Sequence, residues 1–339
     1  MSHDSTQLTS TEIASLWTSY MNDTMVATML SHMLQYIEDP EIKAGVEQAY
    51  NMAVKNVHFL KELFQQEQFA IPNGFTDDDL NTNAPRLYSD TFSLTYVNHM
   101  AKVGMLAYGG FLSMCVRPDV REFFTNAINE TATLYNTTLE TAVSKGFFVR
   151  APYISVPEEI DYVDTKKYLS GLNPFADKRP LNAIEISHLY MNIQTNSIGA
   201  KLCLSFGQTS QNKEIQEYML RGSEISKKHV MLFTEALAES DLMTPGSPDV
   251  CVSYSTTQTY SDKIMMFHMS LLSAAGTGNY STAAAASQRT DLAVNYERLS
   301  AEIAQFAKSG ADIMIKNSWL EQPPGVNDRE KLVKKEGMS

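Results

Sequence analysis

The sequence contains two copies of one pattern, and this duplication constrains the fold more than any other feature. At an offset of 173 residues the copies match at Leu8, Glu12, Ile13, Leu16 and Lys55, which recur as Leu181, Glu185, Ile186, Leu189 and Lys228. Further along the offset becomes 172, where Tyr88-Ser89-Asp90, Gly104 and Tyr108 recur as Tyr260-Ser261-Asp262, Gly276 and Tyr280. One deletion in a loop explains this change. A match that stays in register over about 145 residues predicts two domains of one fold.

The matched positions divide the chain of 339 residues into four parts. The copies occupy residues 8–152 and 181–325, with a connector at 153–180 and a charged tail at 326–339. A chain of this length also exceeds the usual size of one hydrophobic core, which agrees with two domains.

Each copy contains four long helical patterns. In the first copy they lie near residues 10–37, 40–66, 89–115 and 119–144, with apolar residues at the spacing of one helix face. Neither copy shows the alternation of apolar and polar residues that is typical of β-strands. The sequence therefore predicts an all-α protein with two tandem four-helix bundles.

The links between these patterns indicate how the helices run. The turns at residues 39–40 and 117–119 are short, so the helices on either side of each are antiparallel. The second and third helices are joined by long links, near residues 67–88 and 240–260. About 20 extended residues reach ~60 Å, which suffices to cross a bundle of ~40 Å. The links therefore predict the up-down-down-up, ferritin-like arrangement.

The composition describes an ordinary globular protein, with 43% hydrophobic and 19% charged residues. The net charge of −12 disfavours nucleic acid as a partner, because nucleic-acid binding needs a basic surface. The most apolar stretch, near residues 92–116, contains His99, Lys102 and three glycines. These residues favour a core helix over a membrane span, and we expect no membrane span.

Cysteine usage and the first residues indicate a cellular compartment. Three widely spaced cysteines, Cys115, Cys203 and Cys251, favour free thiols and a reducing environment. The polar N-terminal residues lack the order of a signal peptide, so we expect a cytoplasmic location. The apolar helical surroundings of Cys115 and Cys203 favour buried, inert thiols over a nucleophile.

Ferritin-like bundles often hold two irons, for which two helices each supply a Glu and two each supply a Glu-x-x-His. Neither copy contains Glu-x-x-His. The histidines in the predicted helices are His32, His58, His99, His188, His229 and His268, and none of them matches a histidine of the other copy. The residues expected at mid-height are small or apolar: Thr24, Ala53, Ala101, Thr131, Ser197, Ser226, Ser273 and Ile303. We therefore predict no dinuclear metal centre, no cofactor and no catalytic residue. A mononuclear site that uses Asn51, Asn98 or His58 stays open.

The repeated Tyr-Ser-Asp triplet has two interpretations. Its serine and aspartate are typical of a helix start, where a side-chain oxygen accepts hydrogen bonds from the first amides. The alternative is that Tyr88 and Tyr260 line a pocket. The triplet is favoured as a helix start at the end of the long crossover.

Two acids inside helices also recur, Glu62 as Glu235 and Glu130 as Glu302. They lie at different heights of the bundle, so they do not form a dinuclear site. In the predicted helix order, the turn between the third and fourth helices of each copy lies near the end of the second helix. We therefore expect two weak surface ion pairs, Arg117–Glu62 and Arg289–Glu235.

Five stretches resemble a known family: IPNGFTDDDLNTNAPRLYSD, NAIEISHLYMNIQTNSIG, YSDKIMMFHMSLL, SQRTDLA and WLEQPP followed by DREKL. They are similar to a duplicated, ferritin-like family of unknown function from spore-forming bacteria, over nearly the whole chain. Relatives in that family carry a provisional label as spore coat proteins. The resemblance implies tandem bundles and deposition in the spore coat, and it brings no catalytic residues.

Two functions from different classes follow. The first is a non-enzymatic structural or interaction protein of the spore coat, with protein partners or self-association and with its copies packed through apolar surface. The second is a ferritin-like metal or small-molecule binding protein, an oxidoreductase with atypical ligands. The missing metal-ligand spacing favours the first.

Overall fold

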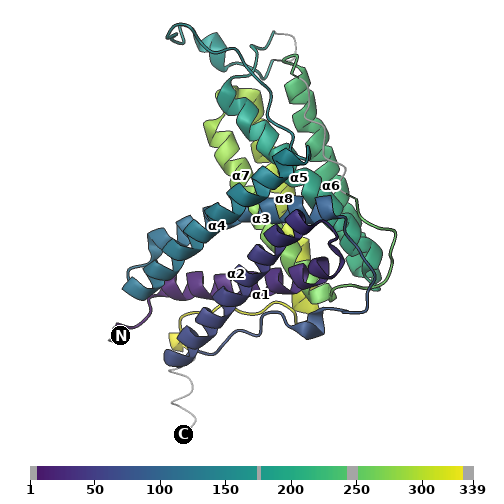
Figure 1. The fold of residues 1–339 in the computed structure, drawn as a ribbon. Helices are drawn as coiled ribbons and strands as arrows, with labels where there is room; N and C mark the ends of the chain where they lie inside the picture. The colour runs from purple at the N-terminus through teal and green to yellow at the C-terminus, as the bar shows by residue number, and fades with distance from the viewer. Residues whose placement is uncertain (1–5, 174–176, 243–250, 331–339) are drawn as a thin grey trace.

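The computed structural model describes residues 6–173, 177–242 and 251–330. Eight long helices form in these residues (Figure 1): α1 (Ser10–Tyr36), α2 (Pro40–Gln66), α3 (Asp90–Met114), α4 (Pro118–Ser144), α5 (Ala183–Thr209), α6 (Lys213–Ala238), α7 (Asp262–Ala286) and α8 (Thr290–Lys316). The described residues contain no β-strand, only two isolated bridges. The predictions of an all-α fold and of four helices per copy are confirmed.

The segments between the helices contain two 3₁₀ helices, η1 (Asp77–Asp79) and η2 (Lys166–Leu169). Three predicted segments extend beyond the described residues: residues 243–250 of the second crossover, 174–176 of the connector and 331–339 of the tail.

Contacts at the helix ends establish the order of the first bundle. Asp90 at the start of α3 accepts hydrogen bonds from the amides of Glu38 and Asp39, in the turn between α1 and α2. Glu12 in the first turn of α1 accepts hydrogen bonds from the amides of Val116 and Arg117, in the turn between α3 and α4. Helices α2 and α3 therefore run parallel, and the long crossover returns the chain along the whole bundle.

The second bundle has the same order. Glu185 in the first turn of α5 accepts hydrogen bonds from the amides of Gln288 and Arg289, between α7 and α8. Asp262 at the start of α7 accepts one from the hydroxyl of Ser210, which follows α5. The up-down-down-up arrangement therefore holds in both halves.

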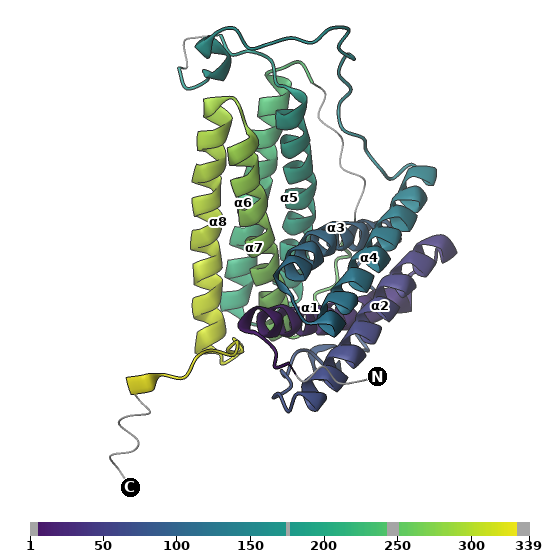
Figure 2. The same ribbon diagram turned by 90° about the vertical axis from the view of Figure 1, so that its left-hand side faces the viewer.

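The two bundles share one hydrophobic core. Figure 2 shows helices α1 to α4 against the lower part of α5 to α8, steeply inclined to them. Buried residues of α1 and α3, such as Met25 and Leu94, belong to the same cluster as Leu202 of α5 and Met265 of α7. A second, smaller cluster fills the other end of the second bundle. The expectation that the copies pack through apolar surface agrees with this core.

The predicted ion pairs Arg117–Glu62 and Arg289–Glu235 are wrong. Arg117 pairs instead with Glu67, just beyond α2, at 2.7 Å and with Asp119 at 2.8 Å. Its side chain is buried, and so is that of Arg289, which pairs with Glu239 at 3.4 Å and Asp291 at 2.6 Å. The helix order was right, but the partner acid is the residue that directly follows each second helix, whereas Glu62 and Glu235 lie within the helices.

Candidate functional site

The crossover segments pair across the two repeats. Leu80 forms an antiparallel bridge with Tyr260, and Val252, which matches Leu80, forms one with Tyr88, which matches Tyr260. The amide of Asn81 donates to the carbonyl of Thr259 at 2.8 Å, and the matching amide of Ser253 donates to Leu87 at 2.8 Å. Equivalent residues of the two repeats therefore make reciprocal contacts, as in a symmetric dimer.

The tyrosines of the repeated triplets lie in this interface. The hydroxyl of Tyr88 shares a hydrogen bond of 2.9 Å with Ser205 of α5, and the hydroxyl of Tyr260 donates to the carbonyl of Met29 in α1 at 3.1 Å. Both tyrosines are buried. The side chains of Ser89 and Ser261 accept hydrogen bonds at the starts of α3 and α7, so the prediction of a helix start is confirmed.

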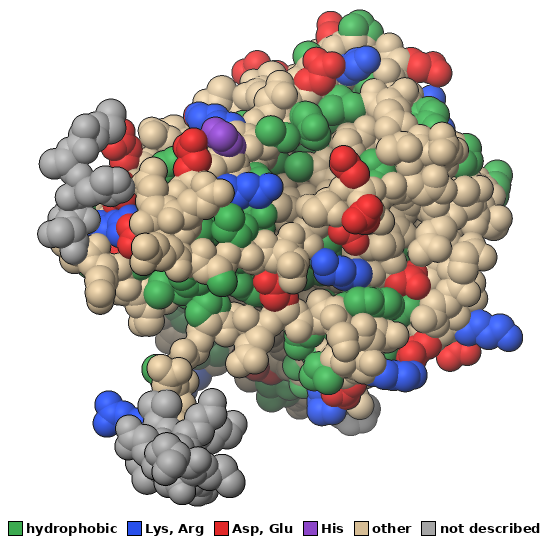
Figure 3. Space-filling model, turned by 90° about the horizontal axis from the view of Figure 1, so that it is seen from below, with side chains coloured by type: hydrophobic (Ala, Val, Ile, Leu, Met, Phe, Trp, Pro, Cys, Tyr) green, Lys and Arg blue, Asp and Glu red, His purple; other side chains and the backbone are tan. Residues whose placement is uncertain are grey.

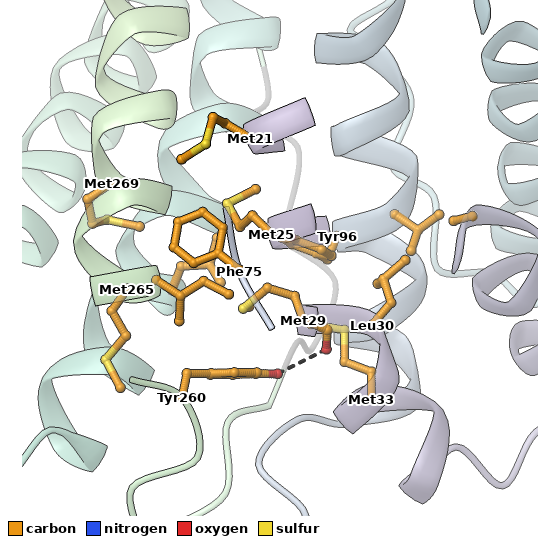
Figure 4. Close-up of a cluster of buried hydrophobic side chains, with 14 of the residues drawn as sticks. Met21, Met25, Met29, Leu30, Met33, Phe75, Tyr96, Tyr260, Met265 and Met269 are labelled. Carbon is orange, nitrogen blue, oxygen red and sulfur yellow. Dashed lines mark hydrogen bonds between the residues drawn. The ribbon is translucent and has the colours of Figure 1, made fainter. Parts of the chain in front are cut away.

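A row of methionines fills the space between α1 and α7. Met21, Met25, Met29 and Met33 recur every four residues on α1 and are all buried. Figure 4 shows Met21, Met25 and Met29 extending toward the side of Met265 and Met269 of α7, with Phe75 between them. Methionine adapts its shape to irregular gaps, which suits two non-identical surfaces.

Buried histidines lie beside these contacts. Burial, with smaller effects of the Lys102 and His268 charges, lowers the pKa of His99 to about 3. Burial lowers the pKa of His268 to about 4. His99 Nε2 and His268 Nδ1 have no hydrogen-bond partner among the described residues. Both imidazoles are therefore neutral at pH 7.

A polar cluster occupies the middle of the first bundle. The hydroxyl of Tyr108 in α3 donates to Asp23 Oδ1 in α1 at 3.2 Å. Asp23 Oδ2 is buried and has no hydrogen-bond partner in the described part of the chain. Burial raises the pKa of Asp23 to about 7, and the neighbouring side chains of Tyr108 and Asn56 only partly oppose that shift. Lys55 and Glu130 form an ion pair at the surface nearby.

A cavity of about 100 Å³ adjoins Asp23. Its lining combines Asp23, Asn56 and Tyr108 with apolar residues of all four helices, among them Val26, Met52, Val97 and Leu134. Ala53, Ala101 and Thr131, which were expected at mid-height, also line it. The expectation that only small or apolar side chains meet at this height is therefore wrong in the first bundle, because it missed a carboxyl group one position before Thr24.

The second bundle carries a related but closed cluster at the matching positions. Asn196 Nδ2 donates to the hydroxyl of Tyr280 at 2.8 Å, and the same hydroxyl shares a hydrogen bond of 2.8 Å with His229 Nδ1. His229 Nε2 lies 3.0 Å from Glu302 Oε2, and Glu302 also pairs with Lys228. This chain of contacts runs from the core to the surface, beside a smaller cavity of about 60 Å³.

Neither cluster fits the two irons that ferritin-like bundles often hold. The first offers one buried carboxyl group, whereas two divalent ions need several carboxylates at one height. In the described part of the chain, no three His, Cys, Asp or Glu side chains gather closely enough to hold a metal ion. Of the side chains considered for a mononuclear site, Asn98 donates to Thr138 at 3.0 Å and the exposed His58 pairs with Glu62 at 3.3 Å.

The connector contains the most exposed apolar side chains of the described chain outside the tail and the crossovers. Within residues 153–164, here called the connector segment, Val156, Ile160 and Tyr162 are 87%, 88% and 84% exposed. The segment has no regular secondary structure. Figure 2 shows this link leaving the end of α4 and passing clear of both bundles on its way to α5.

The face of the molecule seen from below (Figure 3) is mixed. The face seen in Figure 3 intersperses acidic, basic and apolar side chains rather than gathering one kind. Among the residues that the structure describes, none of the helices combines the length and the apolarity needed to cross a lipid bilayer. Cys115 and Cys203 are buried, as predicted, and burial raises the pKa of Cys203 to about 12.

Comparison with family models agrees with the duplication. A family model described as "Protein of unknown function (DUF3231)" matches residues 1–160 and again residues 169–332. No curated protein matches the chain. A crystal structure described as that of a "putative spore coat protein" from Bacillus halodurans is similar, with 18% identity and a TM-score of 0.40. The match covers 44% of this chain and 98% of the other.

Proposed function

Since the chain belongs to the DUF3231 family, whose function is unknown, we propose a function from its own geometry. It is a non-enzymatic interaction protein, in which two fused bundles hold the connector segment out for a partner protein. The observation that carries this proposal is the exposure of Val156, Ile160 and Tyr162. Apolar side chains that are grouped and exposed typically mark a contact with another molecule.

The charge of the connector segment indicates the chemistry of the partner. Residues 153–164 contain no Lys or Arg, and the acidic residues among them are Glu158, Glu159, Asp161 and Asp164. A complementary surface would combine apolar pockets with a rim of Lys or Arg side chains. Extended segments bind such surfaces through alternate side chains and free backbone groups.

The interface between the repeats supports the proposal by anchoring both ends of the connector. The connector leaves the first bundle at α4 and enters the second at α5. Because the shared core and the paired crossovers hold the bundles together, the two anchoring points stay in place. A segment held at both ends loses less conformational entropy on binding than a free one.

Deposition in the spore coat belongs to this proposal and rests on the sequence resemblance described above. The test is fractionation of spores from a spore-forming host that carries the tagged chain. We expect the wild-type chain in the coat fraction and the Val156→Ser, Ile160→Ser, Tyr162→Ser variant outside it. A matched variant with Leu106, Leu220 and Met231 changed to Ser removes exposed apolar side chains from helices and should stay in the coat. Equal retention of all three chains would contradict the proposal.

A second candidate function, binding of a small molecule, is favoured by one observation. Asp23 Oδ2 is a buried oxygen without a partner among the described residues, and it lies beside a cavity. The polar groups that face this cavity favour a small organic molecule over a redox metal, since a single carboxyl group does not neutralise a divalent ion. Calorimetric titration of the whole chain with small amines and alcohols tests this candidate.

A further inference from the structure

The cavity of the first bundle is lined by a carboxyl group that lacks a hydrogen-bond partner on one oxygen among the described residues. Asp23 is only 5% exposed. Its Oδ1 accepts from Tyr108, whereas Oδ2 has no partner in the described residues. Burying a carboxyl oxygen without a hydrogen bond is unfavourable, so a native structure normally supplies a partner. Oδ2 adjoins the cavity, so a hydrogen-bond donor placed in the cavity would supply this contact.

The second repeat shows the same position in a closed form. Asn196 stands where the first repeat has Asp23, and it donates to Tyr280 at 2.8 Å. His229, which stands where the first repeat has Asn56, completes the contacts of that tyrosine. The adjoining cavity is smaller, about 60 Å³ against about 100 Å³. The open carboxyl group is therefore particular to the first repeat and is not a requirement of the fold.

We propose that the cavity of the first bundle binds a small primary alkylammonium ion, with its ammonium group on Asp23 Oδ2 and its alkyl chain among Val26, Val97 and Leu134. An ammonium group donates three hydrogen bonds and supplies the missing positive charge. The inference rests on the second candidate function and names the ligand class for it.

The walls set the size and character of the ligand. Most lining side chains are apolar, so the part of the ligand beyond the ammonium group has to be apolar as well. Since an apolar cavity of about 150 Å³ takes up benzene, one of about 100 Å³ suits a ligand of about four or five non-hydrogen atoms. Three residues of α3 that line the cavity are only half-buried: Val103, Gly104 and Ala107. They offer a route of entry.

The charges around the cavity favour a cation over an anion. Lys55 is engaged by Glu130 at the surface, so its charge is compensated. Tyr108 and Asn56 are neutral, which leaves the carboxyl group of Asp23 as the group that sets the potential inside. A bound ammonium ion would stabilise the ionised form of Asp23, whose pKa burial raises to about 7. Binding should therefore be measured near pH 8, where the carboxylate form prevails.

The test is calorimetric titration of the whole chain with n-butylammonium and, separately, with n-butanol. The matched variant is Asp23→Asn, because asparagine is the residue that the second repeat carries at this position. We expect saturable binding of n-butylammonium to the wild-type chain and binding weaker by about tenfold or more to the variant, the loss of one charge-assisted contact. Methyl NMR signals of Met52 and Met100, which line the cavity, should shift at lower n-butylammonium concentrations in the wild-type chain than in the variant.

The outcomes separate this inference from the function on which it rests. Equal affinity of both chains for n-butylammonium would overturn the inference, as would stronger binding of n-butanol. Binding of n-butanol alone would leave a small-molecule site but no amine site. No binding of either probe would overturn both. Unchanged circular dichroism of Asp23→Asn excludes unfolding as the cause of a loss.

Discussion

Tyr96 and His268 occupy the same position of the two repeats, 172 residues apart, and they share a hydrogen bond of 2.8 Å. The reciprocal bridges between the crossovers indicate that an approximate twofold axis relates the repeats. Two equivalent residues can touch only where such an axis passes between them. The axis therefore runs through the contact of α3 with α7. The bridges Leu80–Tyr260 and Tyr88–Val252 lie on either side of it.

Tyr96→Phe should destabilise the chain by about 1–3 kcal/mol. The change leaves His268 Nε2 buried and unpaired, and its Nδ1 already has no partner among the described residues. Urea unfolding measures the difference. Tyr254→Phe is the control, since that side chain is fully exposed and its substitution should cost almost nothing. A cost as small as that of the control would show that the hydrogen bond does not stabilise the interface.

Asp23→Asn should change how stability depends on pH. The pKa of Asp23 rises from 3.8 to about 7 on burial, so the folded chain holds this proton after the unfolded chain has lost it. Stability contributed by the protonated group is therefore lost as pH rises from about 4 to about 7, by up to ~4 kcal/mol.

The groups facing Asp23 are Tyr108, Asn56 and, near the surface, the Lys55–Glu130 pair. The wild-type chain should therefore be less stable than Asp23→Asn near pH 8 and similar to it near pH 4.5, in urea unfolding at both values. A difference that is the same at both pH values would contradict the assignment of the shift to Asp23.

His99→Leu should protect the chain from acid. Burial lowers the pKa of His99 from 6.5 to about 3, so the unfolded chain takes up a proton below pH 6.5 that the folded chain does not. Stability is therefore lost as pH falls below 6.5, by about 2–3 kcal/mol at pH 4.5 from this residue. Leucine stands at the matching position of the second repeat, Leu271. Wild-type and variant chains with parallel stability curves between pH 6.5 and 4.5 would refute this.

Two glycine substitutions should have opposite effects. A Cβ at Gly222 would lie 2.8 Å from Cys203 Sγ and 2.8 Å from the ring of Phe306, which is stacked on Tyr218. Gly222→Ala should therefore cost about 1–3 kcal/mol. A Cβ at Gly110 in α3 would meet nothing within 4 Å, so Gly110→Ala should stabilise the chain by up to about 1 kcal/mol. Thermal unfolding of both variants checks the signs, and a stabilising Gly222→Ala would show that the close contact between α6 and its neighbours is absent.

The helices could be predicted from sequence because their signals are local. Capping residues such as Thr9 and Ser89 mark the starts, and the predicted ranges differ from the observed ones by one residue at most. The helix order followed from link lengths. The ion pairs of Arg117 and Arg289 could not be placed, because a shift of one turn in the partner helix changes which acid is within reach.

The candidate sites were harder to predict, for two physical reasons. Comparison of the repeats finds residues that are the same in both, and it found Tyr108 with Tyr280. The hydrogen-bond partners of these tyrosines differ between the repeats, Asp23 in the first and Asn196 in the second. A search for identical residues therefore does not find them. The pairing of crossovers between repeats was also hidden, since a sequence pattern does not show which of two equivalent partners a segment contacts. The domain limits 8–152 and 181–325 stay a prediction, which limited proteolysis in the connector would test.

The most direct measurement of the proposed function is photo-cross-linking in cells from a single position of the connector segment. A photoreactive residue at Ile160, 88% exposed, is compared with one at Met231 of α6, 62% exposed. The proposal predicts a discrete cross-linked product from position 160 only, with the cross-linked peptide of the partner containing Lys or Arg beside apolar residues. Salt should weaken its formation, because the acidic side chains contribute to the contact. Products of equal yield from both positions, or none from position 160, would contradict the proposal.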